Sequence, residues 1–293
     1  MSSNHPTRLF VTGATGQLGR LVVEALLRTV PPGRIVAGVR DPASETARRI
    51  ADLGVELRIA DYGRPETLDA AFQGIGRLLM ISSSEIGQRV AQHRNVIEAA
   101  KRAGIASVAY TSLLHADTTP LALGEEHRRT EALLRASGLP FTILRNGWYT
   151  ENYTASIPAA LAHGALLGCA GDGRIASAAR ADYADAAAAV LTGADASGAI
   201  HELAGDEAYT LAEFAAAVAE LSGRPVAYRD LTEAAFKDAL IGAGLPDAFA
   251  GLLSNSDAGA AKGALYDGGR TLAALIGRPT TPWRVTIKQA LRS

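Results

Sequence analysis

The sequence predicts a doubly wound α/β fold, a parallel sheet with helices on both faces, joined to a smaller, mainly helical C-terminal cap domain. In the first half of the chain, short apolar runs alternate with helical patterns, as in successive β-α-β units. The runs are apolar almost throughout, which is typical of strands that are covered on both faces. The 293 residues, 48% hydrophobic and 20% charged, are enough for one large α/β unit with a small lobe.

The expected strands of this unit are 8–13, 34–40, 55–61, 77–83, 107–112 and 141–146. The expected helices between them are 17–29, 42–53, 65–73, 86–103 and 124–137. After residue 146 the alternation stops, and one helix and strand (182–193 and 199–205) are expected to return to the sheet. The prediction is therefore a first domain of residues 7–150 and 178–205, with a cap made by 151–177 and the mainly helical 206–293.

The first expected turn carries a glycine motif, "VTGATGQLG", between a strand and a helix. Gly13 and Gly16 allow a tight turn and a close approach of the backbone to a pyrophosphate, and Gly19 lets the helix pack close to the sheet. The first N–H groups of the helix would face that anion. A plain glycine-rich turn is the alternative, but the motif's place in the first β-α-β unit favours a Rossmann-type dinucleotide site.

The end of the second strand decides which dinucleotide is expected. An Asp or Glu at this place would bind the 2′-hydroxyl of NAD, whereas the strand here ends in Arg40, whose guanidinium can pair with a 2′-phosphate. Asp41 follows at once and could serve NAD, so NADP(H) is the preferred interpretation and not the only one. Asp61, after the third strand, is placed either to meet the adenine or to cap the next helix.

Two further strand ends carry small hydroxyl residues. Ser82, Ser83 and Ser84 follow the fourth strand, beside the expected reversal of strand order, and can approach the ribose and phosphates closely. Thr111 and Ser112 end the fifth strand and are expected near the nicotinamide. An ordinary loop is the alternative interpretation of the three serines.

Composition excludes several classes of function. Lys plus Arg number 29 against 30 for Asp plus Glu, so no basic excess points to nucleic acid. The single cysteine, Cys169, and the scattered histidines predict neither a disulfide nor a metal site. Without a signal-peptide pattern or an apolar stretch of about 20 residues, a soluble cytoplasmic protein with no membrane span is expected. The oligomeric state stays open.

A family resemblance rests on longer segments, among them "TGATGQLG", "ISSSEIGQR", "YTSLLHAD", "LRNGWYTENY" and "GLPDAFAGLLSNSDAGAAKGALYD". They resemble the atypical branch of the short-chain dehydrogenases/reductases, the NmrA-like group. Within it they are similar to bacterial NAD(P)H:quinone oxidoreductases and, less closely, to triphenylmethane reductases. The resemblance implies an oxidoreductase that uses NADPH, without flavin or metal, to reduce a quinone. It implies that the cofactor is bound by Gly13, Ala14, Thr15, Gly16, Gln17, Leu18, Arg40, Ser82, Ser83 and Ser84, and that the substrate is bound by Asn146, Gly147, Trp148, Tyr149, Thr150 and Glu151.

One pair of residues typical of the superfamily is missing. Counting back from "ASGLPFTILR" puts Leu123 where the catalytic Tyr of a Tyr-x-x-x-Lys motif would stand, and His127 where the Lys would stand. A ketone that accepts hydride becomes a strongly basic alkoxide and needs such an acid. A quinone becomes a phenolate-like anion whose conjugate acid has a pKa of about 10, so solvent can protonate it later. The substitution therefore favours a conjugated acceptor.

The segment after the sixth strand is expected to line the acceptor site. Asn146 can donate a hydrogen bond to an oxygen on which charge develops, and Arg180 is placed to reach the same pocket from the returning segment. Trp148, Tyr149 and Tyr153 offer flat apolar surface, although a packing cluster between cap and sheet is the alternative.

His127 has two interpretations, a catalytic residue (a general acid near neutral pH or a ribose contact) or a helix-surface histidine beside Glu131. The surrounding charge run "GEEHRRTE" is expected to be a solvated helix face.

The preferred function is an NADPH-dependent quinone reductase that transfers hydride directly. One alternative is a non-catalytic redox sensor of the NmrA type, which would bind the dinucleotide tightly without turnover. Another is a reductase of a triarylmethane dye or other conjugated acceptor, which needs no proton at the carbon that accepts hydride.

Overall fold

The computed structural model describes residues 7–194 and 197–292, which fold as two compact units. The first unit comprises the chain up to Ser112, Glu126–Arg145 and Arg180–His201. The second comprises Leu113–Glu125, Asn146–Ala179 and the chain from Glu202 on. The segment Leu113–Glu125, placed by the sequence within the first domain, thus belongs to the second unit.

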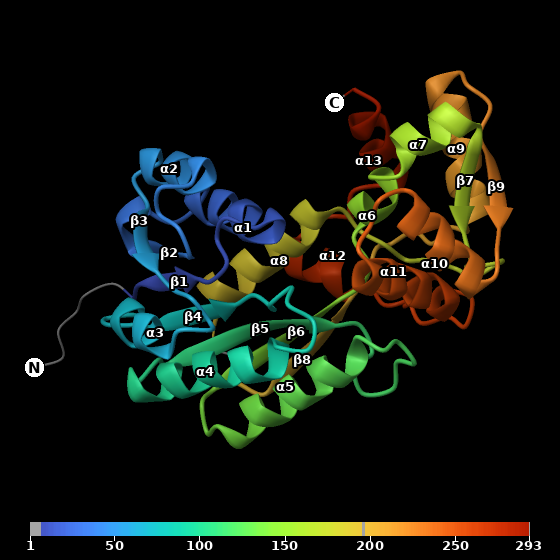
Figure 1. Ribbon diagram of the computed structural model, residues 1–293. Helices are drawn as coiled ribbons and strands as arrows, with labels where there is room; N and C mark the ends of the chain where they lie inside the picture. The colour runs from blue at the N-terminus through green and yellow to red at the C-terminus, as the bar shows by residue number, and fades with distance from the viewer. Residues whose placement is uncertain (1–6, 195–196, 293) are drawn as a thin grey trace, which may run out of the picture. The chain divides into compact units, whose positions relative to one another are not determined.

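A seven-stranded sheet forms the centre of the first unit (Figure 1). Its strand order is β3-β2-β1-β4-β5-β6-β8, and the pairs β1–β2, β2–β3, β1–β4 and β4–β5 are parallel. The strand order reverses between β1 and β4, which creates the crevice where ligands bind in such sheets. The strands are β1 (Leu9–Val11), β2 (Ile35–Val39), β3 (Glu56–Ile59), β4 (Arg77–Met80), β5 (Ser107–Leu113), β6 (Phe141–Asn146) and β8 (Ala199–Leu203).

Helices cover both faces of this sheet, as the apolar strands predict. On one face a core of Phe10, Leu78 and Tyr110 packs against residues of α3, α4 and α5. On the other face α1 and α8 lie side by side, and α8 contacts β4 (Figure 1). The helices are α1 (Gln17–Leu27), α2 (Glu45–Asp52), α3 (Pro65–Ala71), α4 (Arg89–Arg102), α5 (Gly124–Ala136) and α8 (Arg180–Thr192). The fold class and all these elements are confirmed, with ends that shift by a few residues.

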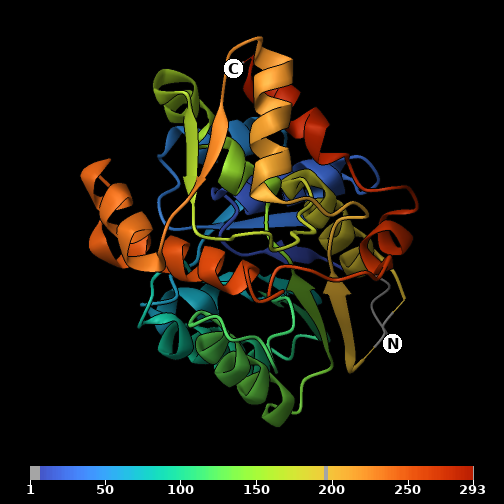
Figure 2. The ribbon, with the colours of Figure 1, turned by 90° about the vertical axis from the view of Figure 1, so that its right-hand side faces the viewer.

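The second unit has its own core and a small sheet. Trp148, Tyr153, Tyr209 and Phe214 are among the buried side chains of this core. The parallel pair β7 (Ala165–Gly168) and β9 (Ala227–Asp230) packs against α9 (Figure 2). The helices are α6 (Thr150–Thr154), α7 (Ile157–His163), α9 (Leu211–Ser222), α10 (Glu233–Gly242), α11 (Asp247–Ala260), α12 (Thr271–Ile276) and α13 (Trp283–Ala290).

The sequence missed the strands β7 and β9. Strand β9 is largely exposed, so the apolar pattern that marks a buried strand is absent from "AYRD". Strand β7 is only four residues long and ends in Gly168, so it merges with the glycine-rich stretch that follows it.

No helix in the described part of the chain is both long and apolar enough to cross a membrane. Across residues 7–194 and 197–292, no group of three or more His, Cys, Asp or Glu side chains is arranged to hold a metal ion.

Candidate active site

The glycine loop joins β1 to α1 in a conformation that depends on two glycines. Gly13 has a φ of +55°, in the left-handed region that side chains other than glycine rarely adopt. A Cβ on Gly19 would lie 2.2 Å from the carbonyl oxygen of Gly13 and 2.7 Å from the Cα of Ala14. The first turn of α1 can therefore lie against the loop only because Gly19 has no side chain. Gly16 is the N-cap of α1, and the first N–H groups of the helix open toward the loop.

A cavity of about 570 Å³ lies at this end of the first unit, at the carboxyl ends of β1, β2, β3 and β4. Its volume is in the range of ligand-binding pockets. It is lined by Gly13, Thr15, Gly16, Gln17, Leu18, Gly19, Gly38, Arg40, Ala60, Asp61, Tyr62, Ile81, Ser82, Ser83, Ser84, Glu85 and Gln92. The tight glycine loop, the helix N-terminus and the guanidinium at the rim fit a phosphorylated dinucleotide. The structure thus brings together nine of the eleven residues predicted to bind the cofactor.

Ala14 and Thr111 are the two that do not line this cavity. The side chain of Ala14 is buried, and its N–H donates to the carbonyl of Gly38 at 3.0 Å, so it is not free for a phosphate. The hydroxyl of Thr111 accepts a hydrogen bond from the N–H of Ser82 at 2.9 Å. Thr111 therefore supports a residue of the cavity wall.

Arg40 and Asp61 face the cavity from the ends of β2 and β3. The guanidinium of Arg40 is largely exposed and forms an ion pair with Glu85 at 3.2 Å. Asp61 lines the cavity and also accepts from the N–H of Gly63 at 2.9 Å, while Arg64 pairs with its other oxygen. Asp61 thus holds the turn before α3, but the N-cap of that helix is Arg64, so the capping alternative is wrong. The contact of Asp61 with adenine stays a prediction.

The segment after β4, residues 81–88, is called the β4 loop below. Two buried side chains of α4 hold the backbone of Ser83 in this loop. The Nε2 of His93 accepts from the N–H of Ser83 at 2.9 Å, and the Nε of Arg89 donates to its carbonyl at 2.7 Å. Glu126, from α5, accepts from Arg89 at 2.7 Å and from the N–H of Gly87 at 3.0 Å. Side chains of α4 and α5 therefore hold the backbone of this loop at Ser83 and Gly87.

This arrangement determines the protonation state of His93. Since Nε2 accepts from a backbone N–H, the ring proton must be on Nδ1, which lies 2.9 Å from the hydroxyl of Thr130. Burial lowers the pKa of His93 from 6.5 to about 3, and the positive charge of Arg89 acts in the same direction. His93 is thus a neutral acceptor throughout the physiological pH range.

Tyr62 connects the ends of β1 and β4 beneath the glycine loop. Its hydroxyl donates to the carbonyl of Ile81 at 2.7 Å and also meets the hydroxyl of Thr12. Thr12 in turn accepts from the N–H of Ile81 at 2.9 Å. The sequence did not single out Tyr62, His93 or Arg89, because their roles depend on which strand ends become neighbours.

The predicted acceptor segment, 146–151, begins at the last residue of β6 and lies in the second unit. Asn146 ends β6 and is buried; its Nδ2 is 3.4 Å from the hydroxyl of Tyr149. Its Oδ1 is buried without a hydrogen-bond partner among the residues that the structure describes. Such an amide oxygen is an exception to the usual rule for buried polar atoms, and exceptions of this kind occur at functional sites.

The rest of this segment runs beside residues 175–178. The N–H of Gly147 donates to the carbonyl of Leu203 at 2.8 Å, and Tyr149 forms a parallel bridge with Ala178. Thr150 is fully buried, and its hydroxyl lies 2.8 Å from that of Ser177. Glu151, in the first turn of α6, and Arg180, which begins α8, are both half-buried.

Two of the three aromatic residues belong to the core of the second unit. Trp148 and Tyr153 are buried there, with ring centroids 6.4 Å apart. The hydroxyl of Tyr153 donates to the buried carboxylate of Asp257 at 2.9 Å. These two side chains therefore pack within the second unit, whereas the packing alternative expected a cluster between cap and sheet. Of the three aromatic residues, Tyr149 is the partly exposed one.

The chain matches a known protein family over most of its length. Residues 6–258 match the NmrA-like family. The chain belongs to the NmrA-like family. Quinone oxidoreductase 2 of Escherichia coli (strain K12) is 57% identical over 271 residues, which cover 92% of this chain and 94% of that protein.

Solved structures agree with this membership. The NADPH-dependent quinone oxidoreductase from Escherichia coli, complexed with NADPH, superposes on this chain with a TM-score of 0.93 at 55% identity. The superposition covers 96% of this chain and 99% of the Escherichia coli chain. The triphenylmethane reductase of Citrobacter sp. has a TM-score of 0.92 at 36% identity, covering 98% of this chain and 100% of its own. NmrA itself, described as a negative transcriptional regulator, is 16% identical with a TM-score of 0.79, so this likeness shows the fold alone.

In this NmrA-like chain, the two positions of the missing Tyr-x-x-x-Lys pair hold residues unsuited to acid catalysis. Leu123 packs against the core of the second unit. His127 is buried, and its Nδ1 lies 2.7 Å from the hydroxyl of Tyr110. Burial lowers the pKa of His127 well below its usual 6.5, with a contribution from the charge of Arg89.

The helix-surface interpretation of His127 is wrong, because only 4% of the residue is exposed. A role as general acid near neutral pH is also disfavoured, since the ring is neutral there and has little tendency to bind the proton that it would have to deliver.

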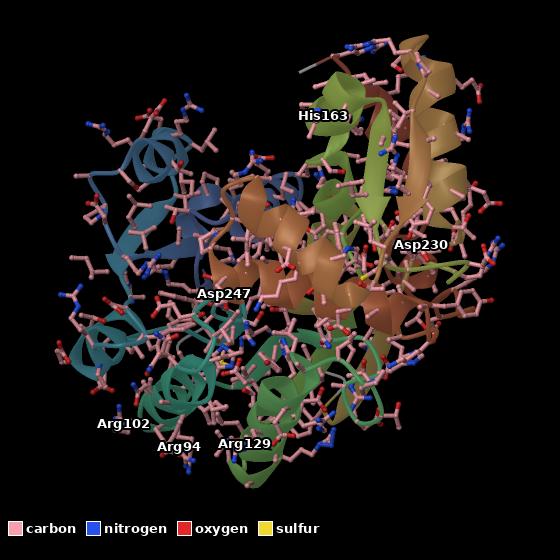
Figure 3. All side chains as sticks on the ribbon, turned by 45° about the vertical axis from the view of Figure 1, so that its right-hand side comes forward. Arg94, Arg102, Arg129, His163, Asp230 and Asp247 are labelled. Atoms are coloured by element: carbon pink, nitrogen blue, oxygen red, sulfur yellow. The ribbon has the colours of Figure 1, made fainter. Side chains whose placement is uncertain are left out.

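The charge run around His127 is likewise not a simple solvated face. Arg129 points away from the sheet, as Figure 3 shows, but Glu131 is buried on the opposite side of α5. Its two oxygens accept from the guanidinium of Arg145 at 3.0 and 2.8 Å, and the hydroxyl of Ser112 donates to it at 2.6 Å. The buried pair of Glu131 and Arg145, together with Ser112, connects α5 to the carboxyl ends of β5 and β6. Part of the run "GEEHRRTE" therefore has a structural role that the sequence alone did not reveal.

Proposed function

We propose that the protein is an NADPH-dependent quinone reductase that transfers hydride directly to its acceptor. The observation that carries this proposal is the chemistry at the two positions of the usual proton donor, an apolar Leu123 and a buried, neutral His127. The identity of 57% with Quinone oxidoreductase 2 supports the same conclusion. A quinone tolerates the loss of the acid because the anion formed from it is a weak base, with a conjugate-acid pKa of about 10.

NADPH, when bound, supplies the hydride and both electrons. The glycine loop and the N-terminus of α1 would hold its phosphates, and Arg40 would bind the 2′-phosphate. Ser82, Ser83 and Ser84 of the β4 loop would lie along the dinucleotide. Thr111, beneath Ser82, supports this wall.

Asn146 is proposed as the residue that stabilises charge on the acceptor. Among the described residues its Nδ2 has one long hydrogen bond, to Tyr149, and its Oδ1 has no partner. A buried polar atom without a hydrogen-bond partner costs about 1–3 kcal/mol of stability. A role in binding the acceptor would explain why Asn146 is kept in this state. Gly147, Tyr149, Thr150, Glu151 and Arg180 are proposed to shape the site around the acceptor.

A dye reductase is the second candidate, favoured by the likeness to the Citrobacter triphenylmethane reductase. A cationic dye accepts hydride at carbon and needs no proton donor, so Leu123 suits both acceptors. A non-catalytic NADPH sensor has weaker support, because the likeness to NmrA lies at 16% identity.

One set of measurements separates these functions. NADPH absorbance is followed with small quinones and with a triarylmethane dye, and NADPH binding is titrated separately. Fast NADPH oxidation with quinones supports the proposal. Turnover with the dye alone would show that the protein is a dye reductase and not a quinone reductase. Tight NADPH binding without turnover of either acceptor would refute both reductases and leave the sensor. Cell fractionation would test the expected cytoplasmic location.

A further inference from the structure

Glu85 is held at the rim of the cofactor cavity opposite Arg40. Its Oε1 lies 3.2 Å from an Nη of Arg40, and its Oε2 accepts from Nε2 of Gln92 at 2.7 Å. Its N–H donates to the hydroxyl of Ser83 at 3.1 Å. All four residues line the cavity.

The position of Glu85 is built into the fold. Ser83 is held through both backbone groups by the buried residues His93 and Arg89. The hydroxyl of Ser83 also donates to Gln92, whose side chain thereby bridges Ser83 and Glu85. A carboxylate on such a frame keeps its place near Arg40 even though both side chains are largely exposed, at 49% and 72%.

We propose that Glu85 is a specificity-determining residue, whose carboxylate takes the place against Arg40 that the 2′-phosphate of NADPH would take. This inference rests on the proposed placement of that phosphate. A guanidinium binds carboxylate and phosphate with the same donors, so the phosphate has to displace Glu85. Once it does, two negative groups lie side by side at the rim. The 2′-hydroxyl of NADH neither has to displace Glu85 nor adds a negative charge beside it, and it can donate a hydrogen bond to the carboxylate. Glu85 therefore narrows the preference for NADPH over NADH.

The expected effect is moderate, since exposed ion pairs are weak. Freeing Arg40 from such a pair and removing the repulsion from Glu85 should each change affinity by a few-fold. Glu85→Gln is therefore expected to tighten binding of 2′-phosphorylated ligands by about threefold to tenfold, and of NADH by less than about twofold. The gain should decline as ionic strength rises.

The test measures dissociation constants for NADPH and NADH, and for adenosine 2′,5′-bisphosphate and AMP, two ligands that differ only in the 2′-phosphate. Glu98→Gln is a matched control, because Glu98 has the same 49% exposure and pairs with a base, Lys101, at 3.6 Å, but does not line the cavity. Arg40→Ala and the Arg40→Ala/Glu85→Gln double variant complete the set.

The inference predicts tighter binding of both 2′-phosphorylated ligands by Glu85→Gln and no change with Glu98→Gln. When Arg40 is absent, Glu85→Gln should give a smaller gain, because only the removal of the repulsion remains. Unchanged or weaker binding by Glu85→Gln, in a protein whose Arg40→Ala variant does lose affinity for the 2′-phosphate, would overturn the inference alone. An Arg40→Ala variant that keeps its preference for 2′-phosphorylated ligands would instead overturn the proposed phosphate site, and the inference with it.

Discussion

Replacing His93 with Leu tests how the β4 loop is held. In the wild type, His93 Nε2 accepts the N–H of Ser83, so the ring must be neutral in the folded protein. Its pKa is lowered by burial to about 3, below the 6.5 of an unfolded chain. Between these two values the unfolded state binds more protons, so the contribution of His93 to stability is present above pH 6.5 and is lost as the pH falls toward 3.

The size of the effect follows from the two pKa values. Between pH 7.5 and 4.5, His93 should lower the wild-type free energy of unfolding by about 2.5 kcal/mol. The Leu variant lacks this dependence. At pH 7 it should be less stable by about 1–3 kcal/mol, because the N–H of Ser83 loses its acceptor. The loosened loop should also weaken NADPH binding.

Urea unfolding at several pH values between 4.5 and 7.5 measures both quantities, and equal urea dependence of the two proteins would justify the comparison. His127 titrates in the same direction but is present in both proteins, so its effect cancels in the difference. If wild type and His93→Leu lose stability in parallel as the pH falls, the assignment of His93 as a neutral acceptor is refuted.

Three further predictions concern the cofactor and the acceptor. Gly19→Ala should weaken NADPH binding at least tenfold and cost about 1–3 kcal/mol of stability, because the new Cβ would lie 2.2 Å from Gly13 O; Gly33→Ala, with no neighbour within 4 Å, should change neither NADPH titration nor melting. Arg40→Ala should raise the KM for NADPH about tenfold or more and that for NADH little, so an unchanged ratio in steady-state kinetics would remove the 2′-phosphate assignment. Asn146→Ala should lower kcat with a quinone about tenfold to hundredfold at an unchanged dissociation constant for NADPH, and a fully active variant would exclude the role on the acceptor oxygen.

The first unit could be predicted closely because most of its strands are apolar and buried and are separated by clear helix signals. Each of its expected strands and helices is present, and the glycine motif marks the cavity where β1 meets α1. The second unit was harder to predict. Its strand β9 is mostly exposed, so its sequence lacks the apolar pattern of a buried strand.

The candidate site divides in the same way. Residues that line the cavity, such as Gly16 and Ser83, lie shortly after strands and could be found by their position. Residues that support them could not, because contacts such as that of His93 with Ser83 exist only after α4 has packed beside the β4 loop. Burial also contradicts the helix-surface interpretation of His127, since one helical turn of charged residues does not show which side of the helix faces the sheet.

The central claim is that an acceptor with a stable reduced form makes a proton donor at position 123 unnecessary. The most direct measurement is the ratio of kcat/KM for a benzoquinone to that for an unactivated aliphatic ketone, with NADPH held at saturation. The account predicts rapid quinone reduction and ketone reduction at the background rate. Comparable rates for the two acceptors would contradict it.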